Sequence, residues 1–145
     1  MKQLVISGFP GTGKSYYIAR GEGSDYMPQG FASDSDSSQF DKSEFPQNYI
    51  KHIKSLIEKG TMRIFVSSHK EVRDALVKEG IEFILVYPKK ELKEEYLNRY
   101  KERGSSEQFI KLISDNWDAW LSELENQKGC THLQLGSNEF MYNKF

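Results

Sequence analysis

Residues 8–15 read Gly8-Phe9-Pro10-Gly11-Thr12-Gly13-Lys14-Ser15, and this run decides the fold. It matches G-x-x-x-x-G-K-[ST], the spacing of a phosphate-binding P-loop. The apolar run Leu4-Val5-Ile6 comes immediately before it and predicts a buried strand, while residues 16–20 can continue as a helix. A strand, a glycine-rich turn and a helix in this order predict a nucleoside triphosphate site. The alternative is a glycine-rich turn that carries a lysine by chance.

Each residue type in the run suits a triphosphate. Glycines let the backbone come close to the phosphates and aim its N–H groups at them, and the following helix adds the positive end of its dipole. Lys14 can reach the β- and γ-phosphates, and the Ser15 hydroxyl can ligate Mg²⁺. The residues predicted to bind the nucleotide are Gly8, Pro10, Gly11, Thr12, Gly13, Lys14, Ser15 and Tyr16.

The composition bounds the class of protein. The chain has 145 residues, 37% of them apolar and 13% aromatic, which suits one domain over 1–145. Lys and Arg number 20 against 21 Asp and Glu. The resulting net charge of −1 argues against a protein whose main ligand is the phosphate backbone of a nucleic acid. The single cysteine, Cys130, favours a reducing cytoplasm. Neither a signal peptide nor a membrane-spanning stretch is evident, and nothing in the sequence predicts an oligomeric state.

Apolar runs and helical periodicities alternate along the chain. Strands are predicted at 2–7, 31–33, 63–67, 83–87 and 132–135. Helices are predicted after the P-loop, around 49–57, and at 70–78, 89–103 and 109–124. This alternation predicts an α/β fold, a three-layer α/β/α arrangement with a five-stranded, mainly parallel sheet. Because ligands bind beyond the carboxyl ends of such strands, functional residues are expected just after each strand.

Two carboxylates, Asp34 and Asp36, follow the second predicted strand. Near a triphosphate, one carboxylate can support Mg²⁺ through a water, and the other can orient an attacking hydroxyl or accept its proton. We expect Asp34 on the metal side and Asp36 on the acceptor side. The alternative is an ordinary polar turn, because Asp and Ser are common turn residues.

The third predicted strand ends in Ser67-Ser68-His69, where many P-loop ATPases and GTPases carry an Asp that supports Mg²⁺. The metal would then depend on Ser15 and the acids after the second strand. Ser68 and His69 can contact substrate or phosphate. Alternatively, Ser68 caps the next helix in a capping box with Glu71 three residues on, and the two roles are compatible.

Arg99 and Arg103 lie four residues apart on one face of the helix predicted at 89–103. They come before the flexible Gly104, so we expect a small lid near 99–110 whose guanidinium groups stabilise a transferring phosphoryl group. The alternative is a solvated helix stabilised by a Glu95–Arg99 pair.

Three further predictions concern the surroundings of the site. The turn Gly136-Ser137-Asn138 after the last strand can touch the nucleotide base. Trp117 and Trp120 are predicted to be core residues rather than a base-stacking platform. Residues 39–49 are the expected place for an acceptor pocket.

In sum the chain resembles the small P-loop kinases of metabolites and nucleotides. Asp34-Ser35-Asp36 resembles the D-x-D of shikimate kinases, and residues 67–76 are similar to the S-x-L-K-x-x-Y-R-D-x-L stretch of gluconate kinases. The helix with Arg99 and Arg103 resembles the lid helix of adenylate-kinase-like enzymes. The whole length resembles short phage-encoded kinases described as adenylate or nucleoside kinase-like. The chain departs from adenylate kinases because no Asp-Gly-Phe-Pro-Arg follows the third strand, and it lacks the Asn-Lys-x-Asp of signalling GTPases.

The resemblance implies an ATP- and Mg²⁺-dependent phosphotransferase that acts on a nucleoside or nucleoside monophosphate. Its implied catalytic residues are Lys14, Asp36, Arg99 and Arg103, and its implied metal ligands are Ser15 and Asp34. Three alternatives stay open. One is a kinase of nucleic acid, acting on a 5′ hydroxyl or a modified base in DNA through a basic groove with Lys42, Lys51 and Lys54. The others are a kinase of small hydroxy acids or sugars, and a non-catalytic ATP-binding switch.

Overall fold

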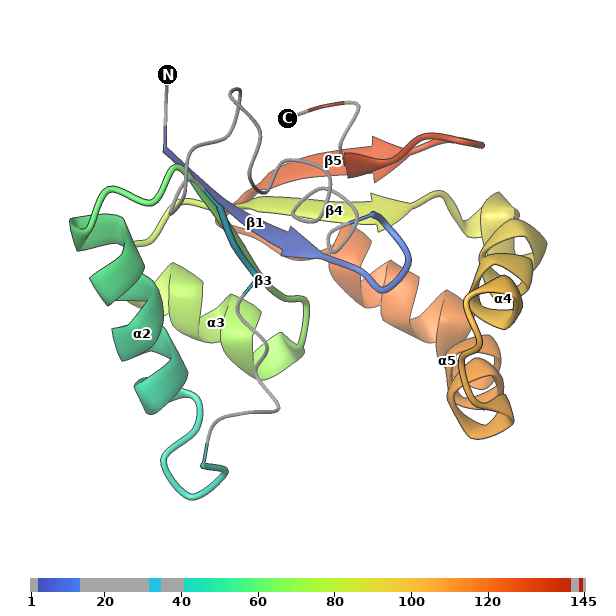
Figure 1. Cartoon of the computed structure of the whole chain (residues 1–145), viewed down its shortest axis with the longest axis horizontal. Coiled ribbons are helices and arrows are strands. Elements are labelled where there is room, and N and C mark those ends of the chain that lie inside the picture. The colour runs from blue at the N-terminus through green and yellow to red at the C-terminus, as the bar shows by residue number, and fades with distance from the viewer. Residues whose placement is uncertain (1–2, 14–31, 35–40, 142–143, 145) are drawn as a thin grey trace.

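The computed structural model of the chain describes residues 3–13, 32–34, 41–141 and 144 (Figure 1). The strands are β1 (Leu4–Gly8), β2 (Ala32–Asp34), β3 (Arg63–Ser67), β4 (Ile84–Pro88) and β5 (Thr131–Leu135). The helices are α2 (Gln47–Glu58), α3 (Lys70–Lys78), the short 3₁₀ helix η2 (Lys90–Leu92), α4 (Lys93–Glu102) and α5 (Glu107–Glu125).

The five strands form one all-parallel sheet in the order β2-β3-β1-β4-β5. β1 is the central strand, and the chain passes from β3 on one side of it to β4 on the other. The register pairs Gly8 with Ser67 and with Val86, so the loop after β1 leaves the middle of the carboxyl edge. In parallel sheets, ligands bind outside the carboxyl ends where the strand order reverses. The loop that begins at Gly8 lies at this position.

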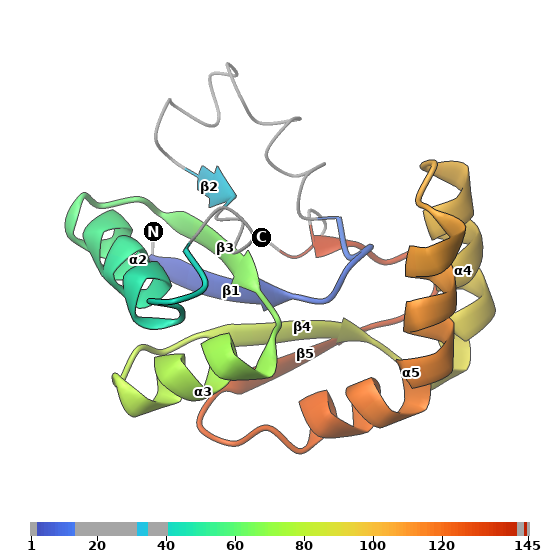
Figure 2. The same cartoon turned by 90° about the horizontal axis from the view of Figure 1, so that it is seen from below.

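Helices α2, α3 and α5 lie on one face of the sheet, and α4 lies beyond its carboxyl edge (Figure 2). Figure 2 shows α2, α3 and α5 in front of the strands, and α4 beyond the arrowheads of β1 and β4. Side chains alternate between the two faces of a strand. On the helical face the core includes Val5, Ile64 and Leu85, and on the opposite face Ile6 and Phe65 join a second cluster.

The fold class predicted from the sequence is confirmed at this level: an α/β fold with a five-stranded, all-parallel sheet. The arrangement is compatible with a three-layer α/β/α fold, although the helix predicted at 16–20 lies outside the described residues. β3 and α3 have the predicted bounds, and the ends of the other described elements shift by one or two residues, except at the start of α4. None of the helices in the described ranges is long and apolar enough to cross a membrane.

The helix predicted at 89–103 is divided into η2 and α4. Leu92 donates its amide to the carbonyl of Lys89, which is a 3₁₀ bond, and the Lys90 carbonyl accepts from the indole Nε1 of Trp117 at 2.9 Å. Because that carbonyl is directed at Trp117, the first turn is wound more tightly than an α-helix. The regular helix therefore begins at Lys93, and α4 ends at Glu102.

Candidate phosphate site

The loop at 8–13 closes on itself immediately after β1. The amide of Phe9 donates to the carbonyl of Val86 at 2.9 Å, and the Thr12 hydroxyl donates to the Phe9 carbonyl at 2.7 Å. Gly11 and Gly13 have φ angles of 87° and 95°, which glycine adopts without strain. Thr12 is predicted to bind the nucleotide; its hydroxyl is used inside the loop, and the residue is buried.

Helix α4 holds the loop from one side. The Tyr100 hydroxyl donates to the carbonyl of Pro10 at 2.7 Å, and Arg99 donates from Nη1 to the carbonyl of Gly11 at 2.6 Å. A Cβ atom on Gly11 would lie 2.8 Å from Cε1 of Tyr100, so only glycine fits against the helix here. Burial raises the pKa of Tyr100 above its ordinary value, which keeps the hydroxyl a donor.

The segment 136–141, which follows β5, holds the loop from another side. The Met141 amide donates to the carbonyl of Thr12 at 2.8 Å, and the Met141 side chain is fully buried. A Cβ atom on Gly8 would overlap Cε of Met141. The loop and this segment therefore pack without space for a larger side chain at Gly8.

Together these contacts engage four successive carbonyls of the loop, those of residues 9–12. The peptide unit is planar and trans, so each N–H points opposite to the carbonyl of the preceding residue. The amide of Gly11 is therefore directed away from α4, and the amide of Gly13 away from Met141. Within the described residues neither amide has an acceptor. Backbone N–H groups that have no acceptor of their own can bind an anion.

The structure places the two predicted arginines differently. Arg99 contacts the loop, and its guanidinium carbon lies 4.2 Å from the ring centres of both Tyr96 and Phe140. Arg103 is exposed, donates from Nε to the Ser105 hydroxyl at 3.2 Å and lies 5.0 Å from the ring centre of Tyr100. Arg99 therefore supports the backbone of the loop, whereas the described contacts of Arg103 stay within its own helix end and α5.

Glu95 connects Arg99 to the 136–141 segment. Its carboxylate accepts from Arg99 Nη2 at 3.5 Å, from the Ser137 hydroxyl at 2.6 Å and from the Asn138 amide at 3.4 Å. The turn predicted to touch a base thus lies beside the predicted lid helix. The sequence indicated a Glu95–Arg99 pair by its spacing, but gave no sign that both residues contact segments far away in the chain.

The end of β3 lacks an acid, as the sequence shows, and its polar groups bind one another. The Ser7 hydroxyl donates to the Ser67 carbonyl at 2.9 Å, and the Ser67 amide donates to the Tyr49 hydroxyl at 3.3 Å. Among the described residues the buried Ser67 hydroxyl oxygen has no partner. This oxygen lies next to the start of the loop, because Ser67 pairs with Gly8.

The predicted capping box at Ser68 is wrong. The N-cap of α3 is His69, which has extended backbone angles and makes no side-chain cap hydrogen bond. Ser68 lies one residue earlier, and its carbonyl accepts from Nε of the buried Arg73 at 2.8 Å. Arg73 also donates to Glu123 and Gln127, so it ties the loop before α3 to α5.

The predicted acceptor side is described only in part. Asp34 is the last residue of β2, at the carboxyl edge, whereas Lys14, Ser15, Tyr16 and Asp36 lie outside the described residues. Among the described residues no group of three acidic, histidine or cysteine side chains is placed to hold a metal ion. The Ser15 and Asp34 metal site stays a prediction.

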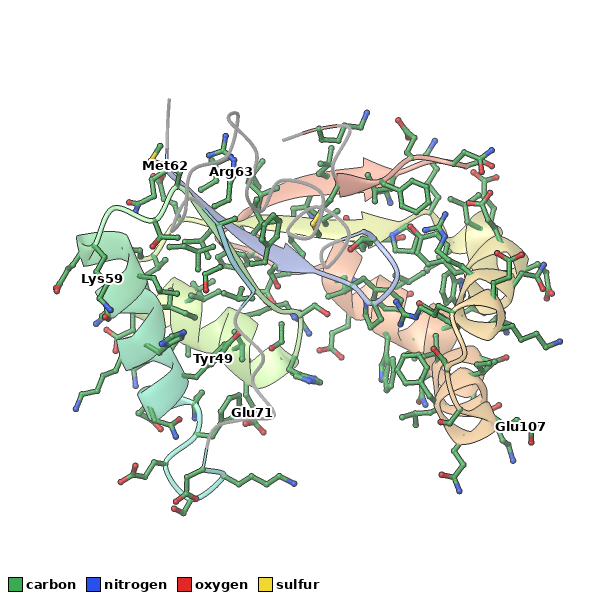
Figure 3. All side chains as sticks on the ribbon, viewed as in Figure 1. Tyr49, Lys59, Met62, Arg63, Glu71 and Glu107 are labelled. Carbon is green, nitrogen blue, oxygen red and sulfur yellow. The ribbon has the colours of Figure 1, made fainter. Side chains whose placement is uncertain are left out.

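The segment 39–49 contributes to the core as well as to the surface. Tyr49, labelled in Figure 3, is fully buried, and its ring centre lies 5.7 Å from that of Phe45. An open hollow of about 300 Å³ is lined by Glu44, Gln47, Asn48 and Lys51. Figure 3 also shows Arg63 at the amino end of β3, across the sheet from the loop, so this buried arginine is not part of the site.

Comparisons with protein-family models, curated proteins and solved structures gave no match.

Proposed function

We propose that the chain is an ATP- and Mg²⁺-dependent phosphotransferase that moves the γ-phosphoryl group to a nucleoside or nucleoside monophosphate. The observation that supports it most is the set of engaged carbonyls at residues 9–12, which leaves the amides of Gly11 and Gly13 without an acceptor among the described residues. This arrangement belongs to the P-loop sequence motif at the carboxyl end of the central strand.

The residues have distinct roles in this proposal. Lys14 and the loop amides would hold the β- and γ-phosphates, and Ser15 and Asp34 would hold Mg²⁺, which would neutralise negative charge on the phosphates. The acceptor oxygen attacks the γ-phosphorus, the bond to the bridging oxygen breaks, and ADP leaves. The proton of the acceptor hydroxyl passes to Asp36. Arg99 contributes positive charge next to the loop. Arg103 reaches the phosphate site only if the carboxyl end of α4 moves.

A transfer screen tests the reaction. Labelled ATP is incubated with nucleosides, monophosphates, small hydroxy acids, sugars and oligonucleotides, and the labelled product is identified. A labelled nucleoside or nucleotide product supports the proposal. A labelled hydroxy acid or sugar shows that the acceptor belongs to that class instead. ATP binding without transfer to any acceptor indicates a non-catalytic switch.

A nucleic-acid acceptor is the second candidate, because one observation favours it. Lys51, Lys54 and Lys78 line a hollow of about 270 Å³ between α2 and α3. Lys54 is paired with Glu79 at 3.3 Å, which reduces the positive charge offered to a polyanion. A mobility-shift assay with DNA and RNA oligonucleotides at low salt tests this candidate, and absence of binding excludes it.

Replacing Lys14 by alanine is expected to lower triphosphate affinity at least tenfold and to abolish transfer, because the β- and γ-phosphates lose their cation. Calorimetric titration with a non-hydrolysable ATP analogue measures the change. Lys101→Ala, an exposed lysine on α4, is the control for loss of one positive charge. Unchanged binding and turnover in Lys14→Ala refutes the P-loop assignment.

Replacing Tyr100 by phenylalanine is expected to weaken triphosphate binding about fivefold and to cost about 1 kcal/mol of unfolding free energy, since the Pro10 carbonyl loses its donor. Tyr96→Phe is the matched control. Tyr96 is also fully buried, one turn earlier, but its hydroxyl has no partner among the described residues. The guanidinium carbon of Arg99 lies over the Tyr96 ring, 4.2 Å from its centre. Chemical denaturation and ligand titration should therefore separate the two variants, and equal effects contradict the role of Tyr100.

A further inference from the structure

Loop 8–13 depends on a segment that the sequence motif does not include. The Met141 amide binds the Thr12 carbonyl, and the guanidinium of Arg99 lies over the rings of both Phe140 and Tyr96. Arg99 in turn binds the Gly11 carbonyl. Two of the four engaged loop carbonyls thus depend on how the 136–141 segment and α4 lie relative to each other.

Glu95 holds α4 and the 136–141 segment in their relative position. It is the described residue of α4 whose side chain contacts both Arg99 and the 136–141 segment. The Glu95 side chain is 28% exposed and the Arg99 side chain 16% exposed, so their interaction is only partly screened by water. Without the carboxylate, Arg99 keeps its aromatic neighbours but loses the anion that directs one edge of its guanidinium.

We propose that Glu95 is a positioning residue of the phosphate site: through Arg99 and the 136–141 segment it sets the direction of the loop amides and hence the affinity for the triphosphate. This inference rests on the proposed function. It extends the site from the P-loop to α4 and to the segment after β5. Glu95 touches neither the nucleotide nor the reacting atoms in this account, and acts only through Arg99, Ser137 and Asn138.

The test compares Glu95→Gln with Glu94→Gln in the full chain. Both changes remove one negative charge from neighbouring positions on α4, but Glu94 is exposed and has no contact with the 136–141 segment among the described interactions. We expect Glu95→Gln to raise the dissociation constant of a non-hydrolysable ATP analogue about tenfold. Glu94→Gln should leave it within about twofold. Equal dissociation constants for the two variants overturn the inference.

A double-mutant cycle separates positioning from a general loss of stability. If Glu95 acts through Arg99, Glu95→Gln combined with Arg99→Gln binds the analogue no more weakly than Arg99→Gln alone. If the fold losses in affinity of the two single variants instead multiply in the double variant, Glu95 acts independently of Arg99 and the inference is overturned. The melting temperature of each variant is measured alongside, because a purely structural role would lower it without changing analogue affinity at a temperature where all variants are folded.

The inference can fail separately from the proposed function. A wild-type chain that binds the analogue, with Glu95→Gln binding it equally well, refutes the inference alone. A wild-type chain that binds no triphosphate refutes the proposed function. In that case the amide resonances of Gly11 and Gly13 in the ligand-free protein decide the positioning role. Movement of these resonances in Glu95→Gln, but not in Glu94→Gln, supports it, and unmoved resonances overturn it.

Discussion

Replacing Gly11 by alanine is expected to lower triphosphate affinity about 100-fold and to destabilise the fold by about 2–4 kcal/mol. Two costs add at this position. The φ angle of 87° is unfavourable for any residue with a Cβ atom, and the new Cβ would lie 2.8 Å from Cε1 of the buried Tyr100. Either the ring or the loop must move. Movement of the loop also breaks the Arg99 and Tyr100 bonds that direct its amides.

Gly104→Ala is the matched control for this prediction. Gly104 has a φ angle of 82°, close to that of Gly11, but a Cβ atom there meets nothing within 4 Å. It should therefore cost about 1 kcal/mol, from the backbone angle alone, and leave affinity unchanged. Urea denaturation and titration with the ATP analogue measure both variants. Similar losses of stability and affinity in the two variants would contradict the packing of Tyr100 on the loop.

Replacing Trp117 by alanine is expected to cost about 3–5 kcal/mol of unfolding free energy, a large share of the 5–15 kcal/mol that stabilises an ordinary domain. Trp117 is 1% exposed, and its ring centre lies 5.7 Å from that of Phe9 and 5.8 Å from that of Tyr96. The change also removes the donor to the Lys90 carbonyl. Because Phe9 belongs to the loop, the cavity should weaken triphosphate binding as well.

Trp120→Ala is the control, since Trp120 is only partly buried against the same core. It should cost less than half as much and leave binding nearly unchanged. The chain contains 2 tryptophans, so each variant retains one fluorescent reporter for denaturation. Equal costs would contradict the larger contribution expected from the more deeply buried Trp117.

Local patterns sufficed to predict β3 and α3 with their bounds. A run of apolar and β-branched residues defines β3, and a helical spacing ended by a glycine defines α3. The start of α4 could not be predicted, because it depends on the bond between Trp117 and the Lys90 carbonyl, residues 27 apart. The Ser68 cap failed for a similar reason: the Ser68 carbonyl is held by the side chain of Arg73.

In the candidate site, too, local patterns predicted some features, whereas others depend on contacts between distant residues. The motif located the loop, and the spacing of Arg99 and Arg103 located a basic helix face. Their separate environments could not be predicted, because Arg99 meets Gly11 across 88 residues and Tyr100 meets Pro10 across 90. Met141 and Phe140 carry no motif at all. Only the parallel sheet, which brings the ends of β1 and β5 to one edge, makes them neighbours of the loop.

The distance along the chain between the loop and Met141 has a consequence for biosynthesis. A ribosome adds about 5–20 residues each second, so a newly made loop waits on the order of ten seconds before residue 141 emerges to bind the Thr12 carbonyl. Until residues 63–102 emerge, the loop also lacks strand β3 beside β1 and the contacts from α4. Nascent chains stalled before residue 136 should therefore be unable to retain a triphosphate, however completely the sheet has formed.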